Sequence, residues 1–543
     1  MSDPLAQLRG ALDGAVADIA DGAAPGSAPA LERPRQTEHG DYATNAALLL
    51  TKQLGVPPRD VAGRLASALA ARLGDKLASS DIAGPGFLNL TLADSWYAQA
   101  LGAVLAASDK WGGGGADPAL RINVEFVSAN PTGPIHVGGT RNAAYGDALA
   151  RILAFRGHHV QREFYVNDYG TQVRRLGESI RARARGEEPP EGGYLGDYVK
   201  DLATEIEGAA DLPVDDLARL GVELMVAQSE RSLARFHVLF DRWFSERSLH
   251  EGAPSAVEHA FDVLAEQGRS FRDEGALWLR TTDFGDDKDR VIERASGEHT
   301  YFASDIAYHQ EKRERGYDLL IDIWGADHHG YVQRMHAAFE ALGGAPGQLE
   351  LLIMQFVHLM EGGERGKMSK RSGEFVTLDE LLDDIGVDAA RWFLLARSHD
   401  TTIDLDLELA RSESSENPVY YVQYAHARIA SMLRKAGPGR VAQALRGAGD
   451  APGDAMHASE RELIRRLLDF PAEVAEAGDR RAPHRIAAYA LDTAQAFSAF
   501  YRDCQVVGVD AATEDHRLRV CAAAKVTLAR SLDLLGVAAP DEM

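Results

Sequence analysis

The sequence of 543 residues contains very little cysteine and no long apolar run. Its two cysteines, Cys504 and Cys521, form no CxxC pair, so we expect neither a structural zinc site nor a disulfide framework, and a reducing cytoplasm fits. An apolar run of about 18 residues, the length that predicts a membrane span, does not occur, and the first residues lack the basic and apolar segments of a secretory leader. We therefore expect a cytoplasmic protein that does not enter a membrane.

Positive charge is also scarce. Lys and Arg number 58 against 82 Asp and Glu, which gives a net charge of −24 and argues against a protein that coats nucleic acid without specificity. From residue 417 onward basic and acidic residues balance, so this part of the chain is the least repelled by a polyanion. The content of 45% hydrophobic and 26% charged residues is that of an ordinary globular protein, and the length predicts about three or four domains.

Residues 121–151 read as a buried strand, a turn rich in proline and glycine, and then a helix. A helix that opens out of such a turn directs its free N–H groups and its positive dipole end at a neighbouring ligand, which suits a phosphate. His136, Gly138 and Gly139 stand where this helix begins, from about residue 139. The two glycines can equally be plain turn residues, so this stretch does not decide the function alone.

The segments before this stretch predict a small α/β domain. Helical spacing of apolar residues covers 4–20, 43–54 and 59–73, and a turn at 84–86 leads into an alternating strand that ends at residue 92. Residues 111–115, Trp followed by four glycines, have the composition of a flexible linker.

The segments after it predict a parallel sheet and then a helical bundle. A strand at 159–166 completes a strand–helix–strand unit, which implies parallel pairing. Residues 174–186 read as a helix with a solvated arginine-rich face, and about 170–275 as a largely helical insertion; further strands are expected at 276–280, 291–293, 319–324 and 351–359. Polar residues 325–330 follow the apolar strand LLIDIW, at the carboxyl end where such sheets bind ligands. From residue 417 the chain reads as a helical bundle.

A second element of chemical interest is the glycine-flanked basic loop at 361–373. It contains Lys367, Met368, Ser369 and Lys370. Two lysines three positions apart in such a loop can close over a triphosphate and neutralise the charge that develops during adenylyl transfer. In isolation the same pattern is typical of an exposed charged loop.

Together, and in this order, these segments resemble the class I aminoacyl-tRNA synthetases, in which the two elements are called the HIGH and KMSKS motifs, and more specifically the arginyl-tRNA synthetases. The phrases that carry the resemblance are VEFVSANPTGPIHVGG (124–139), YVNDYGTQV (165–173), YFASDIAYH (301–309), WGADHHGYV (324–332), GKMSKRSGEFVTLDELL (366–382) and NPVYYVQYAHARI (417–429). It covers nearly the whole chain and includes GPGFLN at 84–89. It implies an α/β fold: a small N-terminal α/β domain that contacts the tRNA D-loop (1–110), a Rossmann-type nucleotide-binding catalytic domain with a helical insertion (120–398), and a C-terminal α-helical anticodon-binding bundle (399–543).

For ATP, the resemblance implies catalytic roles for His136, Lys367 and Lys370. The implied ATP-binding residues are His136, Gly138, Gly139, Asp327, Lys367, Met368, Ser369 and Lys370. Mg²⁺ should accompany ATP and be held mostly by the phosphates, with no metal site built by the protein. The chain departs from the family at Gly139, where a second histidine is usual; Thr140 or Arg141 are candidates to replace it.

Selection of arginine requires carboxylates and a flat wall, because the side chain is a planar cation. The resemblance implies an arginine site made of Glu125, Ser128, Asn130, Tyr301, Asp305 and His328, the first two contributed by the strand before the HIGH turn. Without the resemblance, Tyr301 would read as a core residue and Asp305 as a helix N-cap.

For tRNA, the resemblance implies contacts from both terminal domains. Phe87 and Asn89 match the D-loop contacts, and Tyr420, Tyr424 and Arg428 are expected at the anticodon, where aromatic rings can stack on splayed bases. Within 420–428 some side chains must face the core at helical spacing, so we expect two or three of them to touch RNA.

The implied activity is that of an arginine-tRNA ligase: ATP and L-arginine form arginyl-adenylate, and arginine then passes to the 3′-terminal adenosine of tRNA(Arg). The resemblance further implies a monomer whose arginine activation requires bound tRNA. Two alternatives stay open. One is a synthetase for another amino acid, which the carboxylates of Glu125 and Asp305 argue against; the other is a non-catalytic tRNA-binding paralogue, with Gly139 as a sign of decay.

Overall fold

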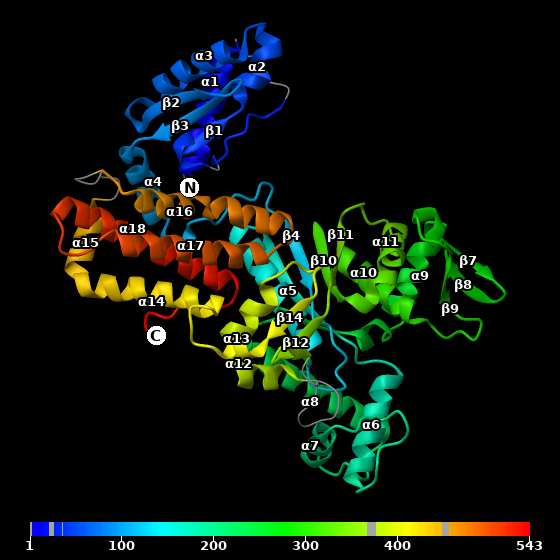
Figure 1. Cartoon of the computed structure of the whole chain (residues 1–543). Helices are drawn as coiled ribbons and strands as arrows, with labels where there is room; N and C mark the ends of the chain where they lie inside the picture. The colour runs from blue at the N-terminus through cyan, green and yellow to red at the C-terminus, as the bar shows by residue number, and fades with distance from the viewer. Residues whose placement is uncertain (1–2, 21–26, 35, 366–375, 448–454) are drawn as a thin grey trace.

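The computed structural model describes residues 3–20, 27–34, 36–365, 376–447 and 455–543 (Figure 1). The N-terminal domain packs three helices on a three-stranded antiparallel sheet of order β1-β3-β2. Its elements are α1 (Pro4–Ile19), β1 (Tyr42–Thr44), α2 (Ala46–Leu54), α3 (Pro58–Leu73), β2 (Leu77–Ala83) and β3 (Phe87–Leu92). The helix predicted over 43–54 begins only at Ala46, because Tyr42–Thr44 pair with β3 instead.

The segment after this domain is fastened to the C-terminal helices, so the prediction of a flexible linker at 111–115 was wrong. Trp111 is 2% exposed, and its indole N–H donates to the Leu467 carbonyl at 2.9 Å. The glycines that follow lie so close to Phe470 and Phe155 that a Cβ on Gly112 or Gly113 would approach a ring carbon to 2.6 or 2.8 Å. These glycines permit close packing. The preceding helix, α4 (Asp94–Ala107), contacts α16 (Ala458–Asp479) and α18 (Ala511–Leu534) near the C-terminus.

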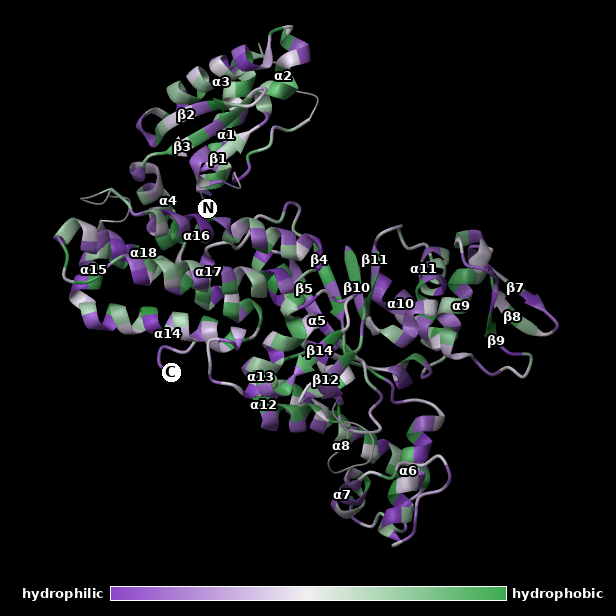
Figure 2. Ribbon diagram, in the orientation of Figure 1, coloured by the Kyte–Doolittle hydropathy of each residue, from purple (hydrophilic) through white to green (hydrophobic). Residues whose placement is uncertain are grey.

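The centre of the molecule is a five-stranded parallel sheet of order β11-β10-β4-β5-β6 (Figure 1). Its strands are β4 (Arg121–Glu125), β5 (His159–Val166), β6 (Arg242–Ser245), β10 (Leu319–Gly325) and β11 (Leu349–Met354). The strand–helix–strand prediction is confirmed, since β4 and β5 pair in parallel and α5 (Val137–Arg156) connects them. The inner strand β10, LLIDIWG, is apolar except at Asp322 and buried over its first five residues, and Figure 2 shows green within this part of the sheet.

The stretch expected as one strand over 351–359 divides into two. β11 ends at Met354, and β12 (Val357–Glu361) pairs in a separate sheet with β13 (Glu364–Arg365) and β14 (Ile403–Asp406). The break lies at Gln355 and Phe356, where the Gln355 N–H donates to the His399 carbonyl and not to a sheet neighbour. An apolar run alone cannot signal such a change of partner.

The prediction of a single insertion at about 170–275 was wrong, because the segment contains β6, a strand of the central sheet. It forms two separate insertions. The first comprises α6 (Thr171–Ala184), α7 (Asp197–Glu205) and α8 (Val214–Arg235) around a hydrophobic core of its own. The chain then returns to the sheet as β6, parallel to β5. The second comprises α9 (Ala256–Glu266) and an antiparallel sheet of β7 (Ser270–Asp273), β8 (Ala276–Leu279) and β9 (Arg290–Glu293).

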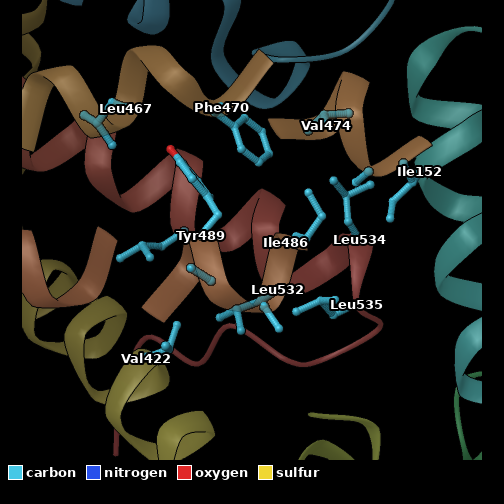
Figure 3. Packing of buried hydrophobic residues seen from close by; sticks show 14 of the residues in the cluster. Ile152, Val422, Leu467, Phe470, Val474, Ile486, Tyr489, Leu532, Leu534 and Leu535 are labelled. Carbon is cyan, nitrogen blue, oxygen red and sulfur yellow. The ribbon is translucent and has the colours of Figure 1, made fainter. Parts of the chain in front are cut away.

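Four further helices complete the catalytic region: α10 (Tyr301–Glu314), α11 (Val332–Ala341), α12 (Leu378–Leu395) and α13 (Leu407–Arg411). The C-terminal bundle consists of α14 (Pro418–Ala436), α15 (Pro438–Arg446), α16 (Ala458–Asp479), α17 (His484–Asp503) and α18 (Ala511–Leu534), which confirms the expected helical domain. Figure 3 shows side chains from these helices converging on one another and on Ile152 of α5, so the bundle and the catalytic region share a core. Among the described residues, no helix is both long and apolar enough to cross a membrane.

Candidate active site

The HIGH turn joins β4 to α5 at the carboxyl edge of the sheet, and His136 caps the helix. Its Nδ1 accepts a hydrogen bond from the Gly138 N–H at 3.1 Å, and α5 begins at Val137, two residues earlier than expected. Burial lowers the pKa of His136, which favours the neutral ring that this acceptor role needs. In that tautomer Nε2 carries the proton, so the ring can donate to an anion from the nitrogen opposite the cap.

The two glycines of the turn differ in the space around them. A Cβ on Gly138 would lie 2.9 Å from Cε1 of His136, so a side chain there would displace the capping imidazole. A Cβ on Gly139 would lie 3.4 Å from the nearest atom, a methyl carbon of Ile135. Lack of room therefore does not explain why a glycine stands at 139 in place of the histidine that the HIGH pattern leads us to expect.

Neither candidate replacement for that histidine is available to a ligand. The Thr140 hydroxyl donates to the His136 carbonyl within the helix. The Arg141 guanidinium is buried and donates to the carbonyls of Gln355, Ser398 and Thr401. The suggestion that Thr140 or Arg141 compensates for Gly139 was wrong, because α5 rotates Arg141 towards β12 and β14 and their flanking loops.

The segment that follows the KMSK loop is hydrogen-bonded to the HIGH turn. The Val137 N–H donates to the Val376 carbonyl at 3.0 Å, and the Leu378 N–H donates to the Ile135 carbonyl at 2.7 Å. Thr377, the N-cap of α12, lies between these two bonds. The predicted residues Lys367, Met368, Ser369 and Lys370 lie outside the described residues. Residues 376–378, which follow that loop, are nevertheless hydrogen-bonded to the start of the helix that His136 caps.

Glu125 is the last residue of β4, and both its oxygens have partners. Ser128 donates to Oε1 at 2.8 Å, and Lys312 donates to Oε2 at 2.5 Å. Burial raises the pKa of Glu125 despite the nearby ammonium. Ser128 lies in the turn beyond the strand and not within it as expected; its φ is 42°, after 69° at Val127. Positive φ at two non-glycine residues, one of them β-branched, is strained backbone of the kind found at functional sites.

Asp305 faces the same region from the second turn of α10. Thr300 is the N-cap of this helix, so Asp305 is not a cap, and its Oδ2 accepts from the Tyr331 hydroxyl at 2.5 Å. Burial raises the pKa of the Asp305 carboxyl, although that hydrogen bond opposes the rise. Tyr301, at the start of the helix, is 73% exposed, which excludes a core-packing role.

The remaining predicted residues of the site are solvent-exposed. Asp327 and His328 follow β10 at its carboxyl end and pair with each other at 3.2 Å. Asn130 is exposed in the HIGH turn. The sheet edge thus brings together the residues expected from 125–139, 301–305 and 327–328. No group of three His, Cys, Asp or Glu side chains that could hold a metal ion occurs in the part of the chain that the structure describes.

Sequence reasoning missed two side chains of this region, Lys312 and Tyr331. Lys312 lies seven residues after Asp305, on the same face of α10, and Asp322 interrupts the apolar strand β10. A charged residue inside an apolar strand, and a lysine in register on an adjoining helix, are signals that the sequence contains. Their pairing depends on the fold.

On the C-terminal bundle, the tyrosine-rich segment of α14 divides into an inner and an outer face. Tyr421, Gln423 and His426 point inward, with hydrogen bonds to Ser498, to Asp388 and the Ala538 carbonyl, and to the Pro540 carbonyl respectively. On the outer face, the Tyr420 and Tyr424 rings stack at 6.2 Å, and Arg428 donates to the Tyr424 hydroxyl at 2.6 Å.

Tyr501 of α17 joins this outer face. The Arg428 guanidinium lies over the Tyr424 ring at 4.5 Å and over the Tyr501 ring at 4.8 Å, on a cavity of about 840 Å³. No pattern in the sequence indicated Tyr501, which lies far from this segment in the chain. In the N-terminal domain Phe87 is exposed, whereas Asn89 is 7% exposed on the central strand β3, which leaves little of its amide for RNA.

Comparisons with known families agree along the whole chain. The family described as "tRNA synthetases class I (R), catalytic domain" matches residues 102–188 and 197–429, more than half of the chain. "Arginyl tRNA synthetase N terminal domain" matches 6–92, and "DALR anticodon binding domain" matches 422–543.

Solved structures agree as well. A putative arginyl t-RNA synthetase from Campylobacter jejuni is 33% identical, with a TM-score of 0.77 over 83% of this chain and 100% of that one. Thermus thermophilus arginyl-tRNA synthetase, at 23% identity, shows the same fold with a TM-score of 0.73 over 98% of this chain and 100% of that one. With its three matching domains and this relative, the chain belongs to the class I arginyl-tRNA synthetases, the arginine-tRNA ligases.

Proposed function

We propose that ATP and L-arginine bind side by side at the carboxyl edge of β4 and β10, with ATP at the N-terminus of α5 and arginine between β4 and α10. The observation that carries this proposal is the convergence of two carboxylates, the buried Glu125 and the half-buried Asp305, beside a helix N-terminus that His136 caps. A helix N-terminus attracts phosphate, and paired carboxylates attract a planar cation.

In the first step, a carboxylate oxygen of arginine attacks the α-phosphorus of ATP. The new P–O bond forms arginyl-adenylate, and the bond to the bridging oxygen breaks to release pyrophosphate. His136 donates from Nε2 to the phosphates, and Lys367 and Lys370 neutralise the charge that the leaving group gains. Mg²⁺ accompanies ATP and is held mostly by the phosphates. Gly138, Gly139, Asp327, Met368 and Ser369 complete the ATP site.

For arginine, Glu125 and Asp305 are the two anions and Tyr301 is the flat wall. Ser128, Asn130 and His328 contribute the remaining polar contacts. In the second step, a ribose hydroxyl of the 3′-terminal adenosine of tRNA(Arg) attacks the acyl carbon, and AMP leaves. Because the preferred partner of two carboxylates is a cation, this arrangement favours arginine over a neutral or anionic amino acid.

For tRNA, the exposed Phe87 contacts the D-loop, and Tyr420, Tyr424 and Arg428 contact the anticodon. The domains divide at 1–110, 120–398 and 399–543, and the enzyme acts as a monomer in the cytoplasm. The exposed aromatic face on α14 supports the anticodon role, because aromatic rings without a core partner can stack on unpaired bases.

Arginine-dependent exchange of pyrophosphate into ATP tests the active-site proposal. We expect exchange with arginine and tRNA(Arg), little exchange without tRNA, and none with lysine. Exchange with another amino acid would identify a synthetase of different specificity. Absence of exchange, with tRNA binding retained, would identify a non-catalytic paralogue.

A further inference from the structure

Three carboxylates stand in a row across the central sheet. Asp322 of β10 is in register with Glu125 of β4, which is in register with Glu163 of β5. Register partners on parallel strands direct their side chains to the same face, and adjacent strands are only about 4.8 Å apart. Like charges at that spacing repel each other, and burial makes their ionisation more costly.

Helix α10 and its C-cap supply the cations that oppose this row. The Lys312 side chain is 0% exposed; its ammonium donates to Glu125 at 2.5 Å and to Asp322 at 2.7 Å, and lies 4.4 Å above the Tyr308 ring. Arg315 forms two hydrogen bonds to Glu163 at 2.5 and 2.9 Å. Within the row Lys312 therefore serves two carboxylates, whereas Arg315 serves only Glu163 and also pairs with Glu311 of α10 at 2.9 Å.

The three carboxylates differ in consequence. At Glu163 the effect of burial is outweighed by Arg315, with a smaller contribution from Lys312, and the pKa is lowered. At Asp322 burial is likewise outweighed, by Lys312 and by His309, which bonds it at 2.9 Å; the pKa falls to about 2. At Glu125 burial prevails over Lys312, and the pKa is raised. Glu125 is thus the carboxylate of the row whose charge depends most on the shared ammonium.

We propose that Lys312 is a positioning residue of the arginine site, which keeps the Glu125 carboxylate charged and fixes it between β4 and α10. The inference rests on the proposed role of Glu125 in binding arginine. The same ammonium ties α10 to β4 and β10, and α10 also presents Asp305, seven residues earlier on the same face. One buried cation therefore sets the charge of one arginine-binding carboxylate and the distance to the other.

Several titratable groups face Glu125 besides Lys312. They are His309 and Tyr308 from α10, Asp322 from β10, and Glu163 and Tyr165 from β5. Both carboxylates disfavour the Glu125 anion. His309 places one ring nitrogen on the Asp305 carbonyl and the other on Asp322, so it is engaged with groups other than Glu125.

The test measures arginine and ATP kinetics in the complete aminoacylation reaction as a function of pH. In Lys312→Met the pKa of Glu125 should rise further, so the loss of kcat/KM for arginine at acid pH should begin about one pH unit higher or more. At pH 7 we expect the KM for arginine to increase by about tenfold or more, with little change in the KM for ATP. Lys312→Arg, which retains a cation in a different shape, should fall between Lys312→Met and wild type.

A second variant acts in the opposite direction, which misfolding cannot imitate. Asp322→Asn leaves Lys312 to Glu125 alone and removes a neighbouring negative charge, so the acid loss of kcat/KM for arginine should move to lower pH. This expectation stands even if Lys312→Met fails to fold. If the acid limb of Asp322→Asn stays in place or moves to higher pH, the inference is wrong.

Two controls separate this inference from its premises. Arg465→Met breaks a 2.8 Å pair with Asp41 between the bundle and the N-terminal domain; it should lower the melting temperature without moving the acid limb for arginine. Glu125→Gln tests the arginine site itself. An unchanged KM for arginine in Glu125→Gln overturns the proposed site, whereas a raised KM there, combined with an unchanged KM in folded Lys312→Met, overturns only the role of Lys312.

Discussion

At the residue scale, the proposed arginine site depends on two carboxylates with limited access to water, the buried Glu125 and the half-buried Asp305. Asp305 is the simpler of the two, because it lies in α10, its hydrogen-bonded partner is Tyr331, and burial is the main cause of its raised pKa. A buried carboxylate without a cation is held at a cost, which a bound guanidinium would remove. The residue is therefore well placed to distinguish arginine from smaller or neutral amino acids.

Replacing Asp305 should affect arginine and spare ATP. We expect Asp305→Ala to raise the KM for arginine strongly, and Asp305→Asn to do so at every pH. In the wild type the carboxyl is charged above its pKa, so arginine affinity should fall as the pH drops through a value above the ordinary range of Asp. Steady-state aminoacylation kinetics between about pH 5.5 and 8 measure both the KM for arginine and its dependence on pH. An unchanged KM for arginine in Asp305→Ala would refute the assignment.

Gly139 stands where the HIGH pattern leads us to expect a second histidine, and a histidine should be tolerated at this position. There is room for a Cβ at this position, and the helix propensity of histidine is more favourable than that of glycine by about 0.5 kcal/mol. We expect Gly139→His to fold with an unchanged or higher melting temperature and to accelerate pyrophosphate exchange, because it adds a donor near the phosphates. Gly139→Ala, which adds the Cβ alone, is the matched control and should leave exchange unchanged. Equal exchange rates in the two variants would show that the second histidine contributes nothing here.

At this scale, the sequence predicts a side-chain interaction when the two partners lie close together in the chain. Thr377 and Glu380 form the capping box that their spacing predicts, since both groups lie within one turn. Lys312 and Glu125 are 187 residues apart, and no local pattern joins them. Family resemblance supplied Glu125 because the residue stands in a recognisable phrase, and it passed over Lys312, which stands just outside one.

At the element scale, one side chain of the HIGH turn, His136, combines an observed structural task with a proposed chemical one. His136 caps α5 through Nδ1, and this leaves Nε2 as the protonated nitrogen of the neutral ring. The cap therefore sets the tautomer that a phosphate donor requires. The hydrogen bonds from 135–137 to 376–378 hold the start of α12 at the same place.

Substitution of His136 should separate the two tasks. His136→Asn retains a side-chain acceptor suited to an N-cap, whereas His136→Ala loses it, at a cost of about 1 kcal/mol in the free energy of unfolding. Both lose a hydrogen bond to a charged group, worth about 1.5–3 kcal/mol, so pyrophosphate exchange should fall about tenfold or more in each. Thermal melts and exchange assays on the same preparations measure both quantities. Near-normal exchange in a stable His136→Asn would remove the imidazole from the mechanism.

For whole elements, the sequence predicted well which segments are helices or strands, and poorly which strands pair with each other. The helical bundle and the β4–α5–β5 unit are strongly periodic, and their identification was confirmed. β6 was missed because four residues, RWFS, carry too little pattern to distinguish a sheet strand from a loop in a helical region. The run at 351–359 was read as one strand because its break at Gln355 is set by a hydrogen bond to His399, which the sequence does not reveal.

At the scale of the whole molecule, the segment that follows α18 connects the anticodon domain to the catalytic region. The Arg391 guanidinium, buried in α12, donates to the Leu535 carbonyl and to Asp147 of α5, both at 2.6 Å. Gln423, on the inner face of α14 and next to Tyr424 in the chain, donates to the Ala538 carbonyl at 2.9 Å. The helix that exposes Tyr424 on its outer face is thus fixed to the helices of the catalytic region through hydrogen-bonded backbone.

The outer face of α14 offers the prediction that spans the greatest distance in the molecule. Tyr424 and Tyr501 are about equally exposed, at 40% and 43%, and share the Arg428 guanidinium. If they stack on anticodon bases, Tyr424→Ala should weaken tRNA(Arg) binding by about 1–3 kcal/mol, and Tyr501→Ala by a similar amount. Tyr421→Phe is the matched control, since it removes only a hydroxyl that bonds Ser498 on the inner face.

Filter binding at fixed salt, with full-length tRNA(Arg) and with a transcript carrying an altered anticodon, distinguishes stacking at this site from general attraction. Loss of discrimination between the two RNAs in Tyr424→Ala, but not in Tyr421→Phe, is the expected result. Retained discrimination in Tyr424→Ala would place anticodon recognition elsewhere on the bundle.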